Sequence, residues 1–158
     1  MRLIANISML FMELPLAERL AAAQQAGFEA VEIQFPEAGD ITALQAAAGN
    51  TGLPITLINV PRGPGDAVGL AALPGQEQAF RAAVATCAAH AEALGVRKVN
   101  VLAGRPAPDA DTALCRQVLK DNLLHTADVM EKIGVQVMVE PVNPMDVPGF
   151  FLTGLRPA

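Results

Sequence analysis

The stretch Val135–Asn143, Val-Gln-Val-Met-Val-Glu-Pro-Val-Asn, reads as a β-strand that ends in a carboxylate. Its side chains alternate between an apolar side and a side that becomes polar toward the carboxyl end. The apolar side holds Val135, Val137 and Val139, and the other side holds Gln136, Met138 and Glu140. In a barrel of parallel strands the apolar side faces the surrounding helices, and the other side faces the interior. Glu140 is therefore expected at the rim where such barrels carry their chemistry.

The composition indicates one ordered domain. The chain has 158 residues, of which 52% are hydrophobic and 17% charged, a balance that favours a large core over disorder. The formal net charge of −5 argues against a nucleic-acid surface, because phosphate binding requires clustered Lys and Arg. No apolar run approaches the ~18 residues of a membrane span, and the N-terminus lacks a signal-peptide pattern. We expect a cytoplasmic protein that binds neither nucleic acid nor membranes.

A repeated unit organises the chain: a helical stretch, a glycine, an apolar residue and a β-rich run. Glycine is the expected residue just after a helix, because it adopts the left-handed conformation without strain from a Cβ atom. The repeats are Gly27-Phe28 before Ala30–Phe35, Gly52-Leu53 before Ile55–Val60, Gly95-Val96 before Lys98–Ala103, and Gly134-Val135 before the last strand. With an opening strand at Leu3–Ser8, the sequence predicts five parallel strands joined by four crossover helices.

The cysteines and histidines of the chain, which are reactive groups in many enzymes, lie in the helical stretches. Cys87, Cys115, His90 and His125 all fall within them, which favours reduced buried thiols and structural imidazoles over catalytic groups. The fourth helix is expected to begin after Asp109 or Asp111. The Pro- and Gly-rich stretch 61–75 is expected to form a loop at the active site rather than a linker, since the repeats continue on both sides of it.

The same alternation divides the side chains of every strand into two sets. The set expected to face the helices is apolar: Val31, Ile33, Phe35, Ile58, Val60, Val99, Val101, Val135, Val137 and Val139. The opposite set carries polar side chains near the carboxyl ends: Asn6, Ser8, Gln34, Asn59, Asn100 and Glu140. We interpret the first five of these as substrate-pocket residues and Glu140 as the catalytic residue, because parallel strands bring their carboxyl ends to one rim. A structural network of amides is the alternative interpretation.

Glu140 is also the one candidate metal ligand at this rim. A site for Mg²⁺ or Mn²⁺ requires several oxygen ligands, and Glu140 supplies one. Glu32 is the other inward acid, but it lies nearer the middle of its strand and is expected to be structural. The chain contains no HExxH, CxxC, P-loop, GxGxxG or GxSxG motif, which excludes the common metalloprotease, nucleotide-binding and serine-hydrolase patterns.

Several stretches, in their order, resemble the hydroxypyruvate isomerase family, including 2-oxo-tetronate isomerases, of the xylose-isomerase-like TIM barrels. They are Ala5–Phe11, Ala26–Glu32, Gly69–Gly75, Asn100–Gly104, Val139–Asn143 and Pro148–Thr153. The resemblance implies that residues 1–153 form the N-terminal part of such a barrel, with 154–158 as a tail outside the family pattern. A whole barrel has eight strands. The implied fold is therefore α/β, a partial (β/α) TIM barrel with strands six to eight missing.

The resemblance also implies a reaction, the interconversion of hydroxypyruvate and tartronate semialdehyde or of a related 2-oxo-tetronate. A divalent metal, Mg²⁺ or Mn²⁺, would hold the oxygens of this small hydroxy-oxo acid while a glutamate pair moves a proton. Glu140 matches the family's fifth-strand glutamate, both metal ligand and acid/base. The remaining ligands belong to strands six to eight and are absent from the chain. Val68 stands where the family usually has an arginine before the glycine matched by Gly69, so the resemblance does not extend to that anion-binding residue.

Three hypotheses follow. The first is an isomerase of this family that is inactive as this short chain. The second is a non-catalytic half-barrel that self-associates through its exposed sheet edges or docks on a full-length partner. The third is an endonuclease-like member of the same barrel superfamily, which the acidic charge and the helical positions of both histidines disfavour.

Overall fold

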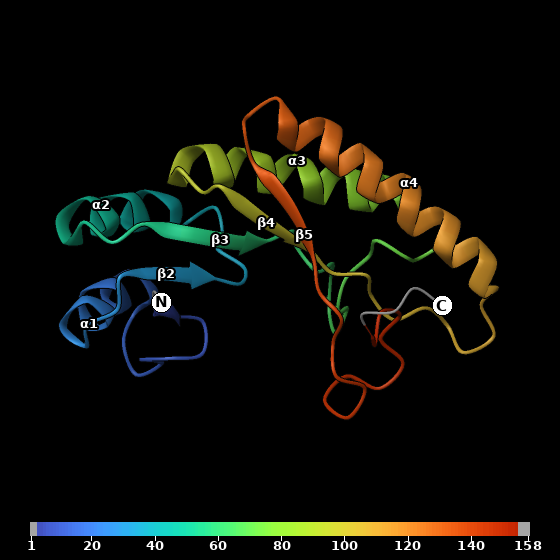
Figure 1. The fold of residues 1–158 in the computed structure, drawn as a ribbon, viewed down its shortest axis with the longest axis horizontal. Coiled ribbons are helices and arrows are strands. Elements are labelled where there is room, and N and C mark those ends of the chain that lie inside the picture. Colours follow the sequence, from blue (N-terminus) through green and yellow to red (C-terminus); the bar gives the residue numbers. More distant parts are fainter. Residues whose placement is uncertain (1–2, 155–158) are drawn as a thin grey trace.

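The computed structural model of the protein describes residues 3–154, which form one sheet of five parallel strands (Figure 1). The strands lie side by side in chain order: β1 (Ile4–Asn6), β2 (Ala30–Ile33), β3 (Ile55–Asn59), β4 (Lys98–Val101) and β5 (Gln136–Val139). Parallel neighbours need a crossover connection after each strand. The predicted α/β class and the strand order are confirmed.

Helices supply these crossovers. They are α1 (Arg19–Gln25), which follows the 3₁₀ turn η1 (Leu16–Glu18), then α2 (Ile41–Thr51), α3 (Glu77–Leu94) and α4 (Thr112–Glu131). Figure 1 shows them as a layer along one side of the curved sheet. α2 and α3 end at Gly52 and Gly95, with φ of 69° and 67°, as the repeat predicts. α4 begins after Asp111, whose carboxylate accepts the Ala113 N–H at 2.8 Å.

The apolar side of the sheet packs against this helix layer. Val31, Val99 and Val101 are fully buried in one continuous core with residues of α1–α4. Val139, at the end of β5, is 39% exposed, because within the described residues no further helix covers that part of the edge strand. The prediction for Phe35 was wrong: β2 ends at Ile33, the alternation ends with it, and Phe35 lines an interior cavity.

Two expectations concern the limits of the chain. The boundary between residues 153 and 154 stays a prediction, and residues 155–158 lie outside the described part. Among residues 3–154, no helix has both the length and the apolar character that crossing a membrane requires.

Candidate active site

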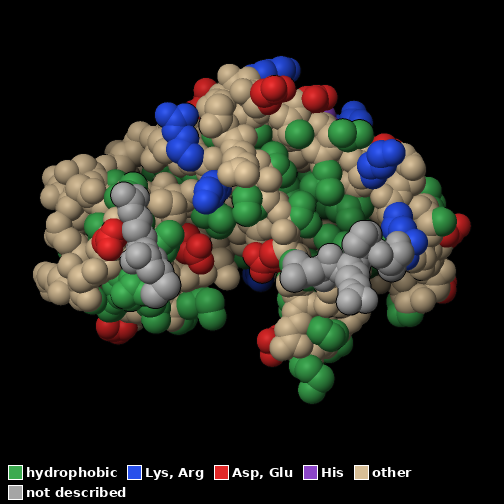
Figure 2. Space-filling view, viewed as in Figure 1, with side chains coloured by type: hydrophobic (Ala, Val, Ile, Leu, Met, Phe, Trp, Pro, Cys, Tyr) green, Lys and Arg blue, Asp and Glu red, His purple; other side chains and the backbone are tan. Residues whose placement is uncertain are grey.

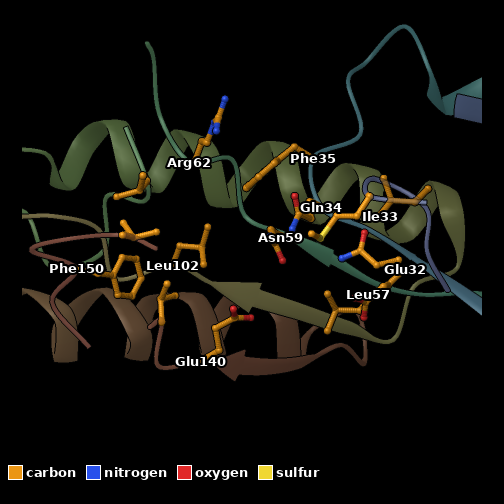
Figure 3. A pocket seen from close by; sticks show the side chains of 15 residues that line it. Glu32, Ile33, Gln34, Phe35, Leu57, Asn59, Arg62, Leu102, Glu140 and Phe150 are labelled. Carbon is orange, nitrogen blue, oxygen red and sulfur yellow. The ribbon is translucent and has the colours of Figure 1, made fainter. Parts of the chain in front are cut away.

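A cavity of about 440 Å³ lies at the carboxyl ends of the strands (Figure 3). Asn6 and Asn59 are the last residues of β1 and β3, and Glu140 directly follows β5. The polar side chains that line this cavity are Asn6, Glu32, Gln34, Asn59, Arg62 and Glu140. Its other lining residues are Met9, Ile33, Phe35, Leu57, Val68, Leu102, Val142, Val147 and Phe150. The cavity therefore combines amides, two carboxylates and one guanidinium with an apolar wall.

The structure brings some of the predicted site residues into this cavity and places others behind it. Asn6, Gln34, Asn59 and Glu140 line it, whereas Ser8 is not among the lining residues. The Ser8 hydroxyl accepts the Gln34 backbone N–H at 2.8 Å, and the Asn6 Oδ1 accepts the Ser8 N–H at 3.1 Å. Ser8 thus fastens the loop after β1 to the end of β2 and holds two cavity residues in place.

Asn100 also lies outside the cavity lining, directly behind the carboxylate. Its Nδ2 donates a hydrogen bond of 2.8 Å to Oε2 of Glu140. Asn100 is 2% exposed, whereas Glu140 is an exposed residue. The carboxylate of Glu140 is therefore held from the sheet on one side and open to the cavity on the other.

The cysteine that lies behind Asn59 is buried and carries an unreactive thiol. The Cys87 thiol of α3 donates to the Asn59 carbonyl oxygen at 3.7 Å. Burial raises the pKa of the Cys87 thiol to about 12, so the thiol stays protonated at neutral pH. Cys87 and Cys115 are both free and buried, which confirms the prediction of two reduced thiols within helices.

The loop after β3 supplies cavity residues that the strand pattern did not predict. Arg62 and Val68 come from the stretch 61–75, which the sequence predicted as an active-site loop without naming its contacts. The Arg62 guanidinium lies 5.5 Å from the centroid of the Phe35 ring, and Figure 3 shows it directed away from Glu140. The signal that could have identified Arg62 is a lone cation just past a strand end.

Backbone contacts fix the path of this loop. Gly69 forms an isolated bridge with Ala103, and the Ala72 N–H donates to the Ala103 carbonyl at 2.7 Å. From the other side, the Phe151 N–H donates to the Gly104 carbonyl at 2.9 Å. The segment after β4 is thus held between two loops that both reach the cavity.

The described residues do not make a complete divalent-metal site. Among them, no three His, Cys, Asp or Glu side chains lie close enough to hold one ion. Glu32 and Glu140 both line the cavity, but Mg²⁺ and Mn²⁺ take several oxygen ligands in a fixed arrangement. The donor set present therefore does not fit a resident metal by itself, and the metal stays a prediction.

Comparison with known proteins identifies the family. The Xylose isomerase-like TIM barrel family matches residues 20–156. The chain belongs to this family. The hydroxypyruvate isomerase of Escherichia coli (strain K12) is 38% identical over 160 residues, covering 100% of this chain and 62% of the relative. The 2-oxo-tetronate isomerase of Cupriavidus necator is 39% identical over 155 residues, covering 96% of this chain and 59% of the relative.

Two solved structures have the same fold. A crystal structure of a Brucella melitensis protein named AP endonuclease, family 2, superposes with a TM-score of 0.91 at 33% identity, over 96% of this chain and 60% of that one. A 3-keto-D-glucoside 4-epimerase from E. coli shares the fold at 19% identity, with a TM-score of 0.70 over 90% of this chain and 57% of that one. The chain spans about 60% of the length of these relatives, which confirms the predicted partial barrel.

Proposed function

We propose that the chain carries the fifth-strand glutamate of an isomerase site for a small hydroxy-oxo acid. The reaction would interconvert hydroxypyruvate and tartronate semialdehyde, or act on a related 2-oxo-tetronate. The observation that carries this proposal is the position of Glu140, at the carboxyl end of β5 and on the wall of a cavity rich in amides. The names of the E. coli and C. necator relatives support the substrate class.

In this proposal Glu140 moves the proton. The carboxylate takes the proton from C3 of hydroxypyruvate, and the C–H electron pair becomes the double bond of an enediolate. Return of a proton to C2, with transfer of the hydroxyl proton from O3 to O2, yields tartronate semialdehyde. Asn6, Gln34 and Asn59 would donate hydrogen bonds to the substrate oxygens, and Arg62 supplies the positive charge at the cavity wall. A cavity of about 440 Å³ accommodates an acid of this size.

A divalent metal, when bound, would supply a Lewis acid for the enediolate oxygens. Glu140 is the ligand that this chain would offer to it. Because the described residues provide no group of three metal ligands, we propose that the other ligands come from outside them and that this chain alone does not turn over.

A chimera tests the assignment. The chain through residue 153 would be joined to the remaining part of the E. coli relative, and hydroxypyruvate isomerisation followed by proton NMR in the presence of Mn²⁺. We expect turnover by the chimera, none by this chain alone, and a loss of about 10²–10⁴-fold in kcat for Glu140→Gln. Glu32→Gln, a second carboxylate of the same cavity, is the matched control and should lose less.

Each outcome of this experiment decides one part of the proposal. Robust turnover by the chain alone would contradict the proposed inactivity. A folded chimera without turnover, or one in which Glu32→Gln is as damaging as Glu140→Gln, would contradict the role of Glu140.

A non-catalytic half-barrel that self-associates or docks on a full-length partner is the second candidate. A groove of about 790 Å³ runs between α4 and β5, and its apolar lining includes Leu123, Leu124, Val139 and Phe151. Leu124 is 57% exposed, and Figure 2 shows hydrophobic side chains gathered on this part of the surface. Sedimentation equilibrium of the chain and of Leu124→Lys discriminates the two: a concentration-independent monomer counts against self-association.

The endonuclease hypothesis finds support in the name of the B. melitensis structure. His90 lies in α3 and His125 lies in α4, and the net charge is −5. These positions favour the isomerase proposal, since the cavity residues are carboxylates and amides rather than imidazoles.

A further inference from the structure

We propose that Asn100 is a positioning residue for Glu140, rather than a residue of the substrate pocket. Its side-chain amide donates to Glu140 Oε2 at 2.8 Å, and Asn100 itself does not line the cavity. The inference concerns a contact within the chain, and only its consequence for catalysis rests on the proposed function.

The two residues of this contact, Asn100 and Glu140, differ in how firmly the fold holds them. Asn100 lies in the third position of β4, between β3 and β5, and its backbone is paired with Asn59 on one side and Met138 on the other. Glu140 follows the last residue of the edge strand and is exposed. A side chain of this kind rotates freely in water unless something fixes it. We therefore infer that the buried amide of Asn100 fixes the orientation of the exposed Glu140 carboxylate, and not the reverse.

The register explains how the two side chains meet. Asn100 is directly opposite Met138, so Glu140, two residues further along the chain and just past the end of β5, is its diagonal neighbour. Diagonal neighbours on one face of a sheet are within reach of each other when one side chain is long, as Glu is. The amide must present its nitrogen to Glu140, because two oxygens would repel, and this fixes which way the Asn100 amide points.

The oxygen of the Asn100 amide supports the same role for this residue. Oδ1 of Asn100 is buried and has no hydrogen-bond partner among the described residues. A buried acceptor without a partner destabilises the folded state. Asn100 itself is 2% exposed, so an apolar residue at this position would avoid that cost. The hydrogen bond to Glu140 is the interaction that an apolar residue could not provide.

A neutral donor suits a carboxylate that has to exchange a proton. An arginine or lysine at this position would place a full positive charge against Glu140. The amide orients Oε2 and leaves Oε1 for the cavity without that charge. Positioning of this kind improves the geometry of proton transfer more than it improves substrate binding.

Another buried asparagine in the same chain provides a matched control. Asn122 of α4 is also 2% exposed, and its Nδ2 donates to the Ala71 carbonyl at 2.9 Å. That bond joins two structural elements and does not involve Glu140. Asn100→Leu and Asn122→Leu therefore remove the same group at the same burial, but only the first removes a contact of the carboxylate.

The experiment is side-chain NMR on the full chain, comparing wild type, Asn100→Leu and Asn122→Leu, with Tm measured for each. We expect Asn100→Leu to keep or raise Tm while the Glu140 side-chain order parameter falls to that of a free surface glutamate. Asn122→Leu should lower Tm and leave the Glu140 order parameter unchanged. Should Asn100→Leu fail to fold, slow exchange of the Asn100 amide protons in wild type, lost in Glu140→Ala, reports the same contact.

A Glu140 side chain that is equally ordered with and without Asn100 would overturn the positioning role. In the chimera described above, Asn100→Leu should lower kcat by about 10–100-fold and change KM less than about twofold, as for partners that orient a reacting group. A chimera with no wild-type turnover would end the proposed function and leave the NMR result standing. Equal kcat in wild type and Asn100→Leu would overturn the catalytic consequence.

Discussion

β4 and β5 have almost the same pattern and very different surroundings. Val99 and Val101 of β4 pair in register with Val137 and Val139 of β5. The two β4 valines are fully buried, whereas Val137 is half-buried and Val139 is 39% exposed. β4 has a strand on each side, and β5 is an edge of the described sheet. A strand's own sequence thus indicates which side is apolar, while neighbouring elements decide how completely that side is covered.

The carboxyl ends of the two strands differ in the same way. The segment after β4 is held between the loop at Gly69 and the segment at Phe151. The segment after β5 leads directly to the exposed Glu140 and then into a turn closed by local contacts of Asn143. The hydrogen bond from Asn100 to Glu140 joins the fixed end to the looser one. In the candidate site, the carboxylate of Glu140 follows the edge strand β5 and is held by a hydrogen bond from the central strand β4.

The largest effect on stability is expected at Gly69, where the loop after β3 pairs with the segment after β4. Gly69 has a φ of +128°, and a Cβ atom there would overlap the Leu102 carbonyl. Gly69→Ala should lower the free energy of unfolding by more than about 3 kcal/mol, because strain and a backbone clash act together. Urea denaturation followed by circular dichroism measures this loss.

Gly65→Ala in the same loop is its control. Gly65 has a φ of +61°, and a Cβ atom there would meet nothing within 4 Å. The expected loss is about 1 kcal/mol, from the left-handed conformation alone. Equal losses for the two variants would show that the contact between the loop and the end of β4 is not tight.

Truncation of the paired valines measures the difference between the strands directly. Val101→Ala should cost about 2–3 kcal/mol, because it leaves a cavity under the helix layer. Val139→Ala, its register partner, should cost less than about 1 kcal/mol, since the side chain is already 39% exposed. Similar values from urea denaturation would mean that β5 is covered in solution, for example by a second copy of the chain.

The sequence predicted the parts of this comparison that depend on local periodicity. Alternation identified Val99, Val101 and Val139 as one apolar side, and the glycine repeat placed the helix ends at Gly52 and Gly95. The order of the strands followed from the repeat, and the resemblance to the family was confirmed by the match over residues 20–156.

Features that depend on where elements end, or on contacts across strands, could not be predicted in this way. Phe35 was assigned to the helix side because the alternation was extended past Ile33, where β2 ends. Asn100 was assigned to the pocket because its parity is correct, but the diagonal register with Glu140 fixes its actual contact. The path of the loop that carries Arg62 depends on backbone contacts with the segment after β4, which no local pattern encodes.

A further effect of modest size is expected at alkaline pH, behind the central strands. Burial raises the pKa of the Cys87 thiol to about 12, from an ordinary value of 9.0. Above pH 9.0 the unfolded chain releases this proton and the folded chain keeps it, so stability present below that pH is lost as the pH rises toward 12. Between pH 7 and pH 10 the loss should be about 1 kcal/mol.

Cys87→Val should remove this loss, which urea denaturation at both pH values would detect. Cys115→Val, the same substitution on α4 beside the edge strand, retains Cys87 and should keep the wild-type loss. The contrast between the two variants locates the alkaline loss behind β3, where the Cys87 thiol meets the Asn59 carbonyl. An equal loss of stability in all three proteins would mean that water reaches Cys87 in the folded state. The packing between the helices and the central strands would then be looser than the full burial of the β4 valines indicates.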